Sequence, residues 1–236
     1  MNSKPAHIRK SVEGSLKRLN TDYIDLYYQH RLDPRTPIED TVGEMGRLVK
    51  EGKVRYLGLS EVGPANLRRA HQTHPISVLQ SEYSLWETNL EESVIPTLKE
   101  LGIGLVAYSP VGRGFLTGQI QRVEDFAEDD FRKRLPRFQP DNFAKNLALV
   151  DAVKKVASEK GVTPSQIALA WILSRWANVV PIPGTTRVVH LEENARAASV
   201  DFSDAEMKRI EQVVSSIPIA GPRYSAEQEK LVDRKE

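Results

Sequence analysis

Tyr23-Ile-Asp-Leu-Tyr-Tyr28 is a mostly apolar run that ends in the polar pair Gln29-His30. Four later runs have the same design, in which an apolar segment is followed by a polar or glycine-rich end. They begin at Val54, Val78, Leu105 and Val179. When parallel strands are covered by helices, the groups at their carboxyl ends gather on one face, and such folds bind ligands there. We therefore expect five buried strands and a site built from their carboxyl ends.

Segments with helical periodicity lie between these runs. We expect helices over residues 5–19, 38–50 and 92–101, and two more from about 143 to 160 and 164 to 176. The last strand is followed by helices that begin near Val189 and after Ser203, and capping boxes are recognisable at Thr163-Pro-Ser-Gln166 and at Ser203-Asp-Ala-Glu206. Residues 111–141 interrupt this rhythm, and so long a loop is usually functional or disordered. Strands that alternate with helices predict a parallel sheet with right-handed crossovers.

Composition excludes several classes of protein. At 236 residues the chain suits one large domain or two small ones, and a formal net charge of +1 gives no field that would attract nucleic acid or an acidic membrane surface. Cysteine is absent, which excludes disulfides, thiolate nucleophiles and cysteine-ligated metals, and we expect no metal site. Neither a signal peptide nor a membrane span is recognisable, so we expect a cytoplasmic protein.

Two α/β architectures fit this pattern. A closed (β/α)8 barrel has eight strands and usually about 250 residues, whereas five strands are visible here. An open doubly wound sheet accepts five strands. A dinucleotide-binding sheet of that kind carries a glycine fingerprint after its first strand, but Gln29-His30-Arg-Leu-Asp33 stands there instead. The periodicity favours the open sheet, and the missing fingerprint weighs against its dinucleotide-binding form.

Five sequence strings resemble those of one family in its order and spacing. They are Ser15-Leu-Lys-Arg-Leu-Asn-Thr-Asp-Tyr-Ile-Asp-Leu-Tyr-Tyr-Gln-His30, Gly52-Lys-Val-Arg-Tyr-Leu-Gly-Leu-Ser60, Gln80-Ser-Glu-Tyr83, Tyr108-Ser-Pro-Val-Gly-Arg-Gly-Phe-Leu-Thr-Gly118, and Ile182-Pro-Gly-Thr-Thr-Arg187 with Glu193-Asn194. The chain resembles the aldo-keto reductases, (β/α)8 TIM barrels that reduce aldehydes and ketones with NADPH. The last two strings are more similar to the bacterial, fungal and plant branch that includes potassium channel β-subunits.

The resemblance implies a barrel shortened at its amino end to about five βα units. It implies a partial barrel domain over residues 1–216, which carries the NADP-binding half, and a polar tail over 217–236. The family's catalytic aspartate, tyrosine and lysine lie on earlier strands, so no residue here takes those three roles. Proton donation by such a positioned acid contributes about 10² to 10⁴ in rate. Open barrel edges also favour self-association.

The resemblance assigns a role to each strand end. His30 matches the active-site histidine beside the substrate carbonyl, although a lone histidine at a strand end is more often structural. Ser60 and Gln80 match side chains that hold the nicotinamide carboxamide, and Tyr108 matches the aromatic on which that ring stacks. The backbone of Ser109, Pro110, Val111, Gly112, Arg113 and Gly114 matches the pyrophosphate loop. The adenosine end is matched by Gly184, Thr185, Thr186, Arg187, His190, Glu193 and Asn194.

Three details qualify these assignments. Arg187 is a candidate partner for the 2′-phosphate of NADP, because a guanidinium meets phosphate in a bidentate fork. Glu61 stands where many relatives carry asparagine, so its carboxylate either lies near the carboxamide or turns outward. The charged segment beyond Gly118 matches one that folds over the cofactor, whereas Arg132-Lys-Arg134 within it is expected to be a solvated loop face.

Two functions compete. The first is NADPH-dependent, reversible reduction of an aldehyde or ketone, with activity impaired by the absent aspartate, tyrosine and lysine. The second is a non-catalytic module that binds NADP(H) or regulates a partner, similar to potassium channel β-subunits. An unrelated hydrolase is a weaker hypothesis, since neither a nucleophile elbow nor a metal cluster is visible.

Overall fold

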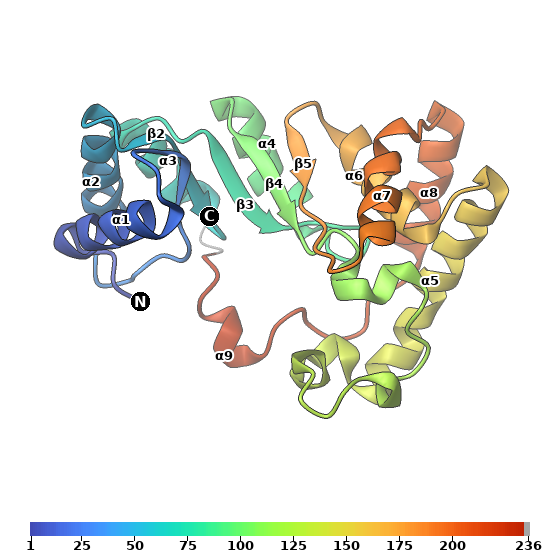
Figure 1. Cartoon of the computed structure of the whole chain (residues 1–236). Helices are drawn as coiled ribbons and strands as arrows, with labels where there is room; N and C mark the ends of the chain where they lie inside the picture. Colours follow the sequence, from blue (N-terminus) through green and yellow to red (C-terminus); the bar gives the residue numbers. More distant parts are fainter. Residues whose placement is uncertain (234–236) are drawn as a thin grey trace. The chain divides into compact units, whose positions relative to one another are not determined.

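Strands and helices alternate along the chain as the sequence pattern predicts (Figure 1). The computed structural model describes residues 1–233. Their five strands form one sheet in the order β1-β2-β3-β4-β5. The strands are β1 (Ile24–Gln29), β2 (Val54–Ser60), β3 (Val78–Glu82), β4 (Gly104–Tyr108) and β5 (Val179–Pro181). Each expected run is therefore a strand.

The α-helices of the described residues are α1 (Pro5–Leu19), α2 (Ile38–Lys50), α3 (Pro64–Thr73), α4 (Val94–Leu101), α5 (Pro140–Lys160), α6 (Pro164–Arg175), α7 (Val188–Arg196), α8 (Asp204–Ser216) and α9 (Ala226–Glu229). Short 3-10 helices connect them: η1 (Asn89–Glu91), η2 (Gly112–Thr117), η3 (Val123–Asp125), η4 (Phe131–Arg134), η5 (Pro136–Phe138) and η6 (Ala197–Ser199). The expected long loop after Pro110 is thus built from η2 to η5. Across residues 1–233 we find no helix with the length and apolar character needed to cross a bilayer.

Contacts divide the described chain into two compact units. Unit 1 comprises Met1–Ser81, Leu90–Val106 and residues 230–233, and unit 2 comprises Glu82–Asn89 and Ala107–Glu229. This division differs from the expected boundary at residue 216. Residues 217–229, which we expected to form a polar tail, lie within unit 2, where Arg223 is buried.

Parallel pairing of β1, β2 and β3 organises unit 1. Tyr28 is paired with Gly58, and Ser60 at the end of β2 is paired with Gln80. A Cβ atom at Gly58 would lie 2.4 Å from the Tyr28 ring, so this close approach requires glycine. The register aligns the carboxyl ends of the strands, and the polar residues that follow them lie at one edge of this part of the sheet.

Local sequence signals end the helices of unit 1. α1 begins at Pro5 and ends at Leu19, and its C-cap residue Asn20 adopts a left-handed conformation (φ 52°) and donates its N–H to carbonyls of the last turn. α2 is followed by Gly52, whose φ of 76° suits glycine, and β2 begins two residues later. The spacing of Ile8, Val12, Leu16 and Leu19 predicts one apolar stripe on α1, but Leu19, the last residue of the helix, is exposed.

Unit 2 is centred on α6 and a group of aromatic side chains. Thr163 and Gln166 form the expected capping box, with Thr163 Oγ1 accepting from the Gln166 N–H and Gln166 Oε1 accepting from the Thr163 N–H. α6 is buried from Ser165 to Ile172, as its apolar sequence predicts. Trp86 stacks on Phe115 at a centroid distance of 4.1 Å, and Phe138 and Phe143 pack around this pair. These contacts hold the segment after β4 against α5.

Candidate functional site

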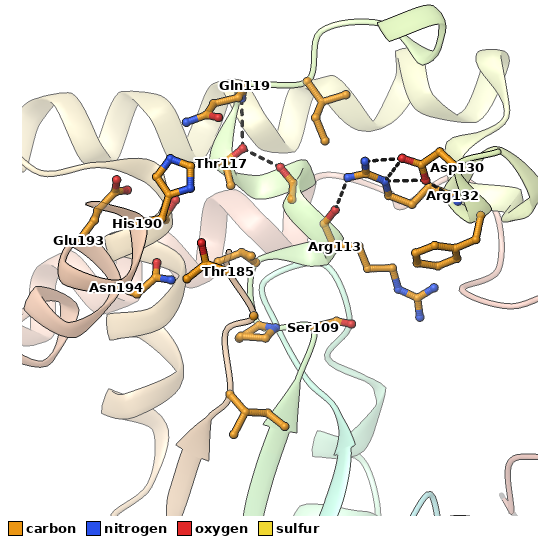
Figure 2. A pocket seen from close by; sticks show the side chains of 18 of the residues that line it. Ser109, Arg113, Thr117, Gln119, Asp130, Arg132, Thr185, His190, Glu193 and Asn194 are labelled. Carbon is orange, nitrogen blue, oxygen red and sulfur yellow. Dashed lines mark hydrogen bonds and ion pairs between the residues drawn. The ribbon is translucent and has the colours of Figure 1, made fainter. Parts of the chain in front are cut away.

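A pocket of about 850 Å³ lies in unit 2, at the carboxyl ends of β4 and β5 (Figure 2). Pockets of this size accommodate cofactors and drug-sized ligands. Its lining comes from the turn after β4, the 3-10 segment that follows, and the residues from Ile182 to Asn194. The lining residues are Ser109, Pro110, Val111, Arg113, Gly114, Thr117, Gln119, Ile120, Ala127, Asp129, Asp130, Phe131, Arg132, Ser165, Ile182, Gly184, Thr185, His190, Glu193 and Asn194.

The turn after β4 is tightly wound. Ser109, Gly112, Arg113 and Gly114 all have positive φ values of 50°, 58°, 59° and 93°. The Gly112 N–H donates to the Ser109 carbonyl (2.8 Å) and the Gly114 N–H to the Val111 carbonyl (3.1 Å). Two non-glycine residues in the left-handed region cost about 1–3 kcal/mol each, and such strain clusters at functional sites. The turn brings backbone rather than bulky side chains to the pocket, but two of its expected pyrophosphate donors are used within the turn itself.

The opposite side of the pocket comes from β5 and α7. The Ile182 N–H donates to the Ala107 carbonyl (3.0 Å), which places the segment after β5 beside the end of β4. In Figure 2 His190, Glu193 and Asn194 extend from α7 toward the pocket. Their spacing of three and four residues puts them on one face of the helix. Glu193 Oε1 accepts from Thr163 Oγ1 (2.7 Å), so the N-cap of α6 orients this carboxylate.

The segment before η5 forms a third side of the pocket. Arg132 pairs with Asp130 (2.6 Å) and donates from Nη1 to the Arg113 carbonyl (2.8 Å). These bonds tie the charged segment to the turn after β4, as the dashed lines in Figure 2 show. The pKa of Asp130 is lowered, chiefly by the hydrogen bond from Arg132. The expectation of a solvated face at 132–134 is wrong for Arg132, which lines the pocket, and holds for the exposed Arg134.

The expected cofactor residues of unit 2 divide into two groups. Those that line the pocket are Ser109, Pro110, Val111, Arg113, Gly114, Gly184, Thr185, His190, Glu193 and Asn194. Those outside its lining are Tyr108, Gly112, Thr186 and Arg187. Gly112 is buried beneath the turn, where a Cβ atom would lie 2.9 Å from Trp86. Arg187 is exposed and caps the start of α7, and its guanidinium forms no ion pair with any residue of the described chain.

Ten of the residues that line the pocket were not predicted individually from the sequence. They are Thr117, Gln119, Ile120, Ala127, Asp129, Asp130, Phe131, Arg132, Ser165 and Ile182. Most lie in the segment that we expected to fold over a cofactor. Ile182 and Ser165 carried weaker signals. Ile182 directly precedes the Pro-Gly-Thr string, and Ser165 lies in the first turn of a helix, where backbone N–H groups attract anions.

His30, Ser60 and Gln80 lie at the ends of β1, β2 and β3 in unit 1. His30 is exposed and borders a hollow of about 240 Å³ between β1, α1 and α2. Arg31 donates from Nη1 to Ser60 Oγ (2.8 Å), and Ser60 is buried. Burial raises the pKa of Tyr28, and a hydrogen bond with Gln80 opposes that shift. These three residues and the pocket of unit 2 belong to different units, so their convergence on one ligand stays a prediction.

Glu61 adopts a left-handed conformation (φ 56°) directly after β2 and is buried. Its Oε1 atom accepts from Ser81 Oγ at 2.8 Å. The carboxylate is therefore buried rather than turned outward, and its proximity to the carboxamide stays a prediction. A positive φ is costly for a residue with a Cβ atom, which marks the end of β2 as a second strained position in the chain.

A buried ionic group lies beside the turn after β4. Glu82 Oε2 is 2.9 Å from Arg113 Nη2 and 3.6 Å from Arg223 Nη1. Arg137, whose charge also acts on Glu82, pairs with Glu87 (2.7 Å). Burial raises the pKa of Glu82, and the charges of Arg113 and Arg223 oppose that effect. The guanidinium of Arg113 is thereby paired with Glu82, and Arg113 also lines the pocket.

The pocket suits a dinucleotide. Its volume, the left-handed glycine turn and the polar face of α7 offer backbone, hydroxyl and amide groups along one extended cavity. A Cβ atom at Gly184 would have no neighbour within 4 Å, so the backbone there is open to close approach. These features are consistent with the residues that the sequence assigns to the pyrophosphate and adenosine parts of NADP(H).

A parallel α/β sheet with a pocket at the carboxyl ends of its strands is the arrangement in which α/β folds, both barrels and open sheets, bind ligands. The model of the Aldo/keto reductase family matches residues 1–215. The chain is 47% identical over 220 residues to probable aldo-keto reductase 1 of Glycine max, covering 93% of this chain and 63% of that protein. It is 46% identical over 235 residues to aldo-keto reductase str7 of Strobilurus tenacellus, covering 98% and 70%. The chain belongs to the aldo-keto reductase family.

Solved structures agree with this assignment. The glycerol dehydrogenase AKR11B4 of Gluconobacter oxydans matches with a TM-score of 0.86 and 30% identity, covering 95% of this chain and 69% of that one. The thermostable aldo-keto reductase Tm1743 matches with a TM-score of 0.71 and 31% identity, covering 89% and 67%. The expected fold class, an aldo-keto reductase type α/β barrel of which this chain contributes five strands, is confirmed. The chain spans 63% of the length of the Glycine max relative.

Proposed function

We propose that this chain takes part in the NADPH-dependent, reversible reduction of an aldehyde or ketone to an alcohol. The observation that supports the proposal most is the pocket of unit 2. It gathers residues from three separated parts of the sequence, and ten of them are residues that the family resemblance assigns to the cofactor. Family membership supports the oxidoreductase chemistry, in which bound NADPH supplies the reducing equivalent.

Each group of residues has a proposed task toward the cofactor or the substrate. The turn after β4 binds the pyrophosphate, and His190, Glu193 and Asn194 bind the adenosine end. Tyr108 stacks on the nicotinamide, Ser60 and Gln80 hold its carboxamide, and His30 orients the substrate carbonyl. Preference for NADP over NAD rests with Arg187, which is exposed, donates its backbone N–H to Thr185 Oγ1 (3.1 Å) and forms no ion pair among the described residues.

Titration with NADPH, followed by quenching of protein fluorescence, tests the binding step. All three tryptophans, Trp86, Trp171 and Trp176, lie in unit 2, so the signal comes from the unit that holds the pocket. Consumption of NADPH with 4-nitrobenzaldehyde then tests the reaction. Quenching with turnover supports the reductase. Absence of quenching refutes the proposed cofactor site.

The second candidate is a non-catalytic NADP(H)-binding or regulatory module. All residues that line the 850 Å³ pocket belong to unit 2. This favours the second candidate, because a cofactor could bind there without a complete substrate site. Quenching by NADPH without turnover of any aldehyde would support this candidate over the reductase.

We also propose that the chain associates with itself through its sheet edge in unit 2. Val180 and Ile182 on and after β5 are 57% and 45% exposed, and Val188 on α7 is 71% exposed. An exposed edge strand with apolar side chains favours pairing with another chain. A concentration-dependent mass in light scattering would support this, and a constant monomer mass would refute it. We propose in addition that the protein is cytoplasmic and that its substrate is a small carbonyl compound.

A further inference from the structure

The segment expected to be a polar tail is bonded to unit 2 and buries one arginine, Arg223, in it. Residues 220–224, here called the strap, are anchored at four residues. Asn146 is fully buried, and it donates to the Ala220 carbonyl (3.0 Å) while accepting from the Ala220 N–H (2.8 Å). Arg137 Nε donates to the Gly221 carbonyl (3.2 Å). A buried amide that is satisfied in both directions fixes the backbone it holds.

The conformation of the strap is specific. Gly221 has a φ of 82°, and a Cβ atom there would lie 2.6 Å from the Asn142 side chain. Two residues later, the Arg223 guanidinium is 5% exposed and lies 3.6 Å from Glu82. The carboxylate of Glu82 fixes the position of this buried guanidinium, because a guanidinium that moved away from it would be a buried charge without a counter-charge. The strap therefore enters the unit along a defined path and ends at Tyr224.

Tyr224 meets the residue that precedes the pocket turn. Its hydroxyl lies 2.7 Å from the hydroxyl of Tyr108, at the end of β4. The Arg113 guanidinium lies 5.2 Å from the Tyr224 ring, and Arg113 lines the pocket. Arg113 and Arg223 share Glu82, so one buried carboxylate links the strap to the turn after β4. The hydroxyl contact restricts the tilt of the Tyr108 ring, because a phenol oxygen bonded at its tip cannot swing without breaking the bond.

We propose that Tyr224 is a positioning residue for Tyr108, and that the strap thereby fixes the surface on which the nicotinamide end of NADP(H) rests. This inference depends on the proposed function, in which Tyr108 contacts the nicotinamide. A ring that is already held in place loses less freedom when a ligand stacks on it, so pre-ordering increases affinity. The effect is confined to the nicotinamide half of the cofactor, since the adenosine end is bound by residues of α7 and the segment after β5.

The test compares two ligands on variants of the full chain. NADPH spans the whole site, whereas adenosine 2′,5′-bisphosphate occupies only its adenosine end. Tyr224→Phe is expected to weaken NADPH binding about 3- to 10-fold, the loss typical of one neutral hydrogen bond, and to leave the bisphosphate unchanged. Tyr56→Phe, at an exposed tyrosine of β2, serves as the matched control and should change neither affinity.

A double-mutant cycle completes the test. If Tyr224 acts through Tyr108, then Tyr108→Phe with Tyr224→Phe should bind NADPH no more weakly than Tyr108→Phe alone. Additive losses, an unchanged NADPH affinity in Tyr224→Phe, or equal losses for both ligands would overturn the inference while leaving the cofactor site intact. If the wild-type chain binds neither ligand, the proposed function fails, and the inference fails with it.

Discussion

Removing the Glu82 carboxylate should destabilise unit 2 strongly. Glu82→Gln keeps the size of the side chain but leaves Arg113 and Arg223, which are 12% and 5% exposed, without the charge they share. Breaking a buried ion pair by deleting one partner costs about 3–5 kcal/mol, because the remaining charge stays desolvated. Two guanidiniums depend on Glu82, although the glutamine can still accept one hydrogen bond. We therefore expect a loss of about 3 kcal/mol, at the lower end of that range.

Urea denaturation followed by tryptophan fluorescence measures this loss. The chain's three tryptophans all belong to unit 2, as do Glu82 and both arginines, so the signal reports the part that is perturbed. Glu159→Gln is the matched control, since Glu159 pairs with Arg209 on the surface of the same unit at 2.7 Å. An exposed pair contributes about 0–1 kcal/mol. Equal, small losses in the two variants would refute the reasoning.

Three further predictions concern single residues. Thr163→Ala should cost about 1–2 kcal/mol in denaturation, because it removes the N-cap of α6, and should weaken NADPH binding by releasing Glu193. Gly114→Ala should cost about 1–2 kcal/mol and reduce NADPH affinity in calorimetry, since its φ of 93° disfavours a side chain and Arg132 lies 3.3 Å from the new Cβ atom. The pKa of Glu206 is lowered to about 2, first by Lys160, so the stability it provides should be lost as the pH falls from about 4.5 toward 2, and Glu206→Gln should reduce that loss in acid-denaturation curves.

Each of these has a matched comparison. Thr163→Ser should restore most of the stability, because a serine hydroxyl also caps the helix. Gly161→Ala shares the positive φ (68°) but has no neighbour within 4 Å, so it should leave NADPH affinity unchanged. An acid midpoint in Glu206→Gln equal to that of the wild type would contradict the prediction for Glu206. An undiminished NADPH affinity in Thr163→Ala or in Gly114→Ala would contradict the prediction for that variant. A loss in Thr163→Ser as large as that in Thr163→Ala would contradict the assignment of the cap.

Local signals predicted much of the fold. Each apolar run is a strand, Gly52 follows α2, and both capping boxes, at Thr163 and at Ser203, begin helices. These features depend on residues within about four positions of one another, which is why the sequence shows them directly. The strings around Tyr108 and Gly184 likewise located the pocket, because the residues that form each wall are close together in sequence.

Features set by distant residues could not be predicted in this way. Arg223 is buried because Glu82, which lies far before it in the sequence, is beside it in the folded unit. Arg132 lines the pocket because it bonds to the Arg113 carbonyl, whereas its charged neighbours suggested a solvated face. The 3-10 helices between Gly112 and Phe138 are similar cases, since the aromatic contacts of Phe115 and Phe138 hold them in place.

Hydrogen–deuterium exchange of the full chain with and without NADPH tests the central claim most directly, because it locates the ligand without requiring turnover. The account predicts slower exchange in residues 109–132 and 182–194 when NADPH is present, and no change there with an equal concentration of ATP. Slower exchange confined to other segments, or no change anywhere at saturating NADPH, would contradict it.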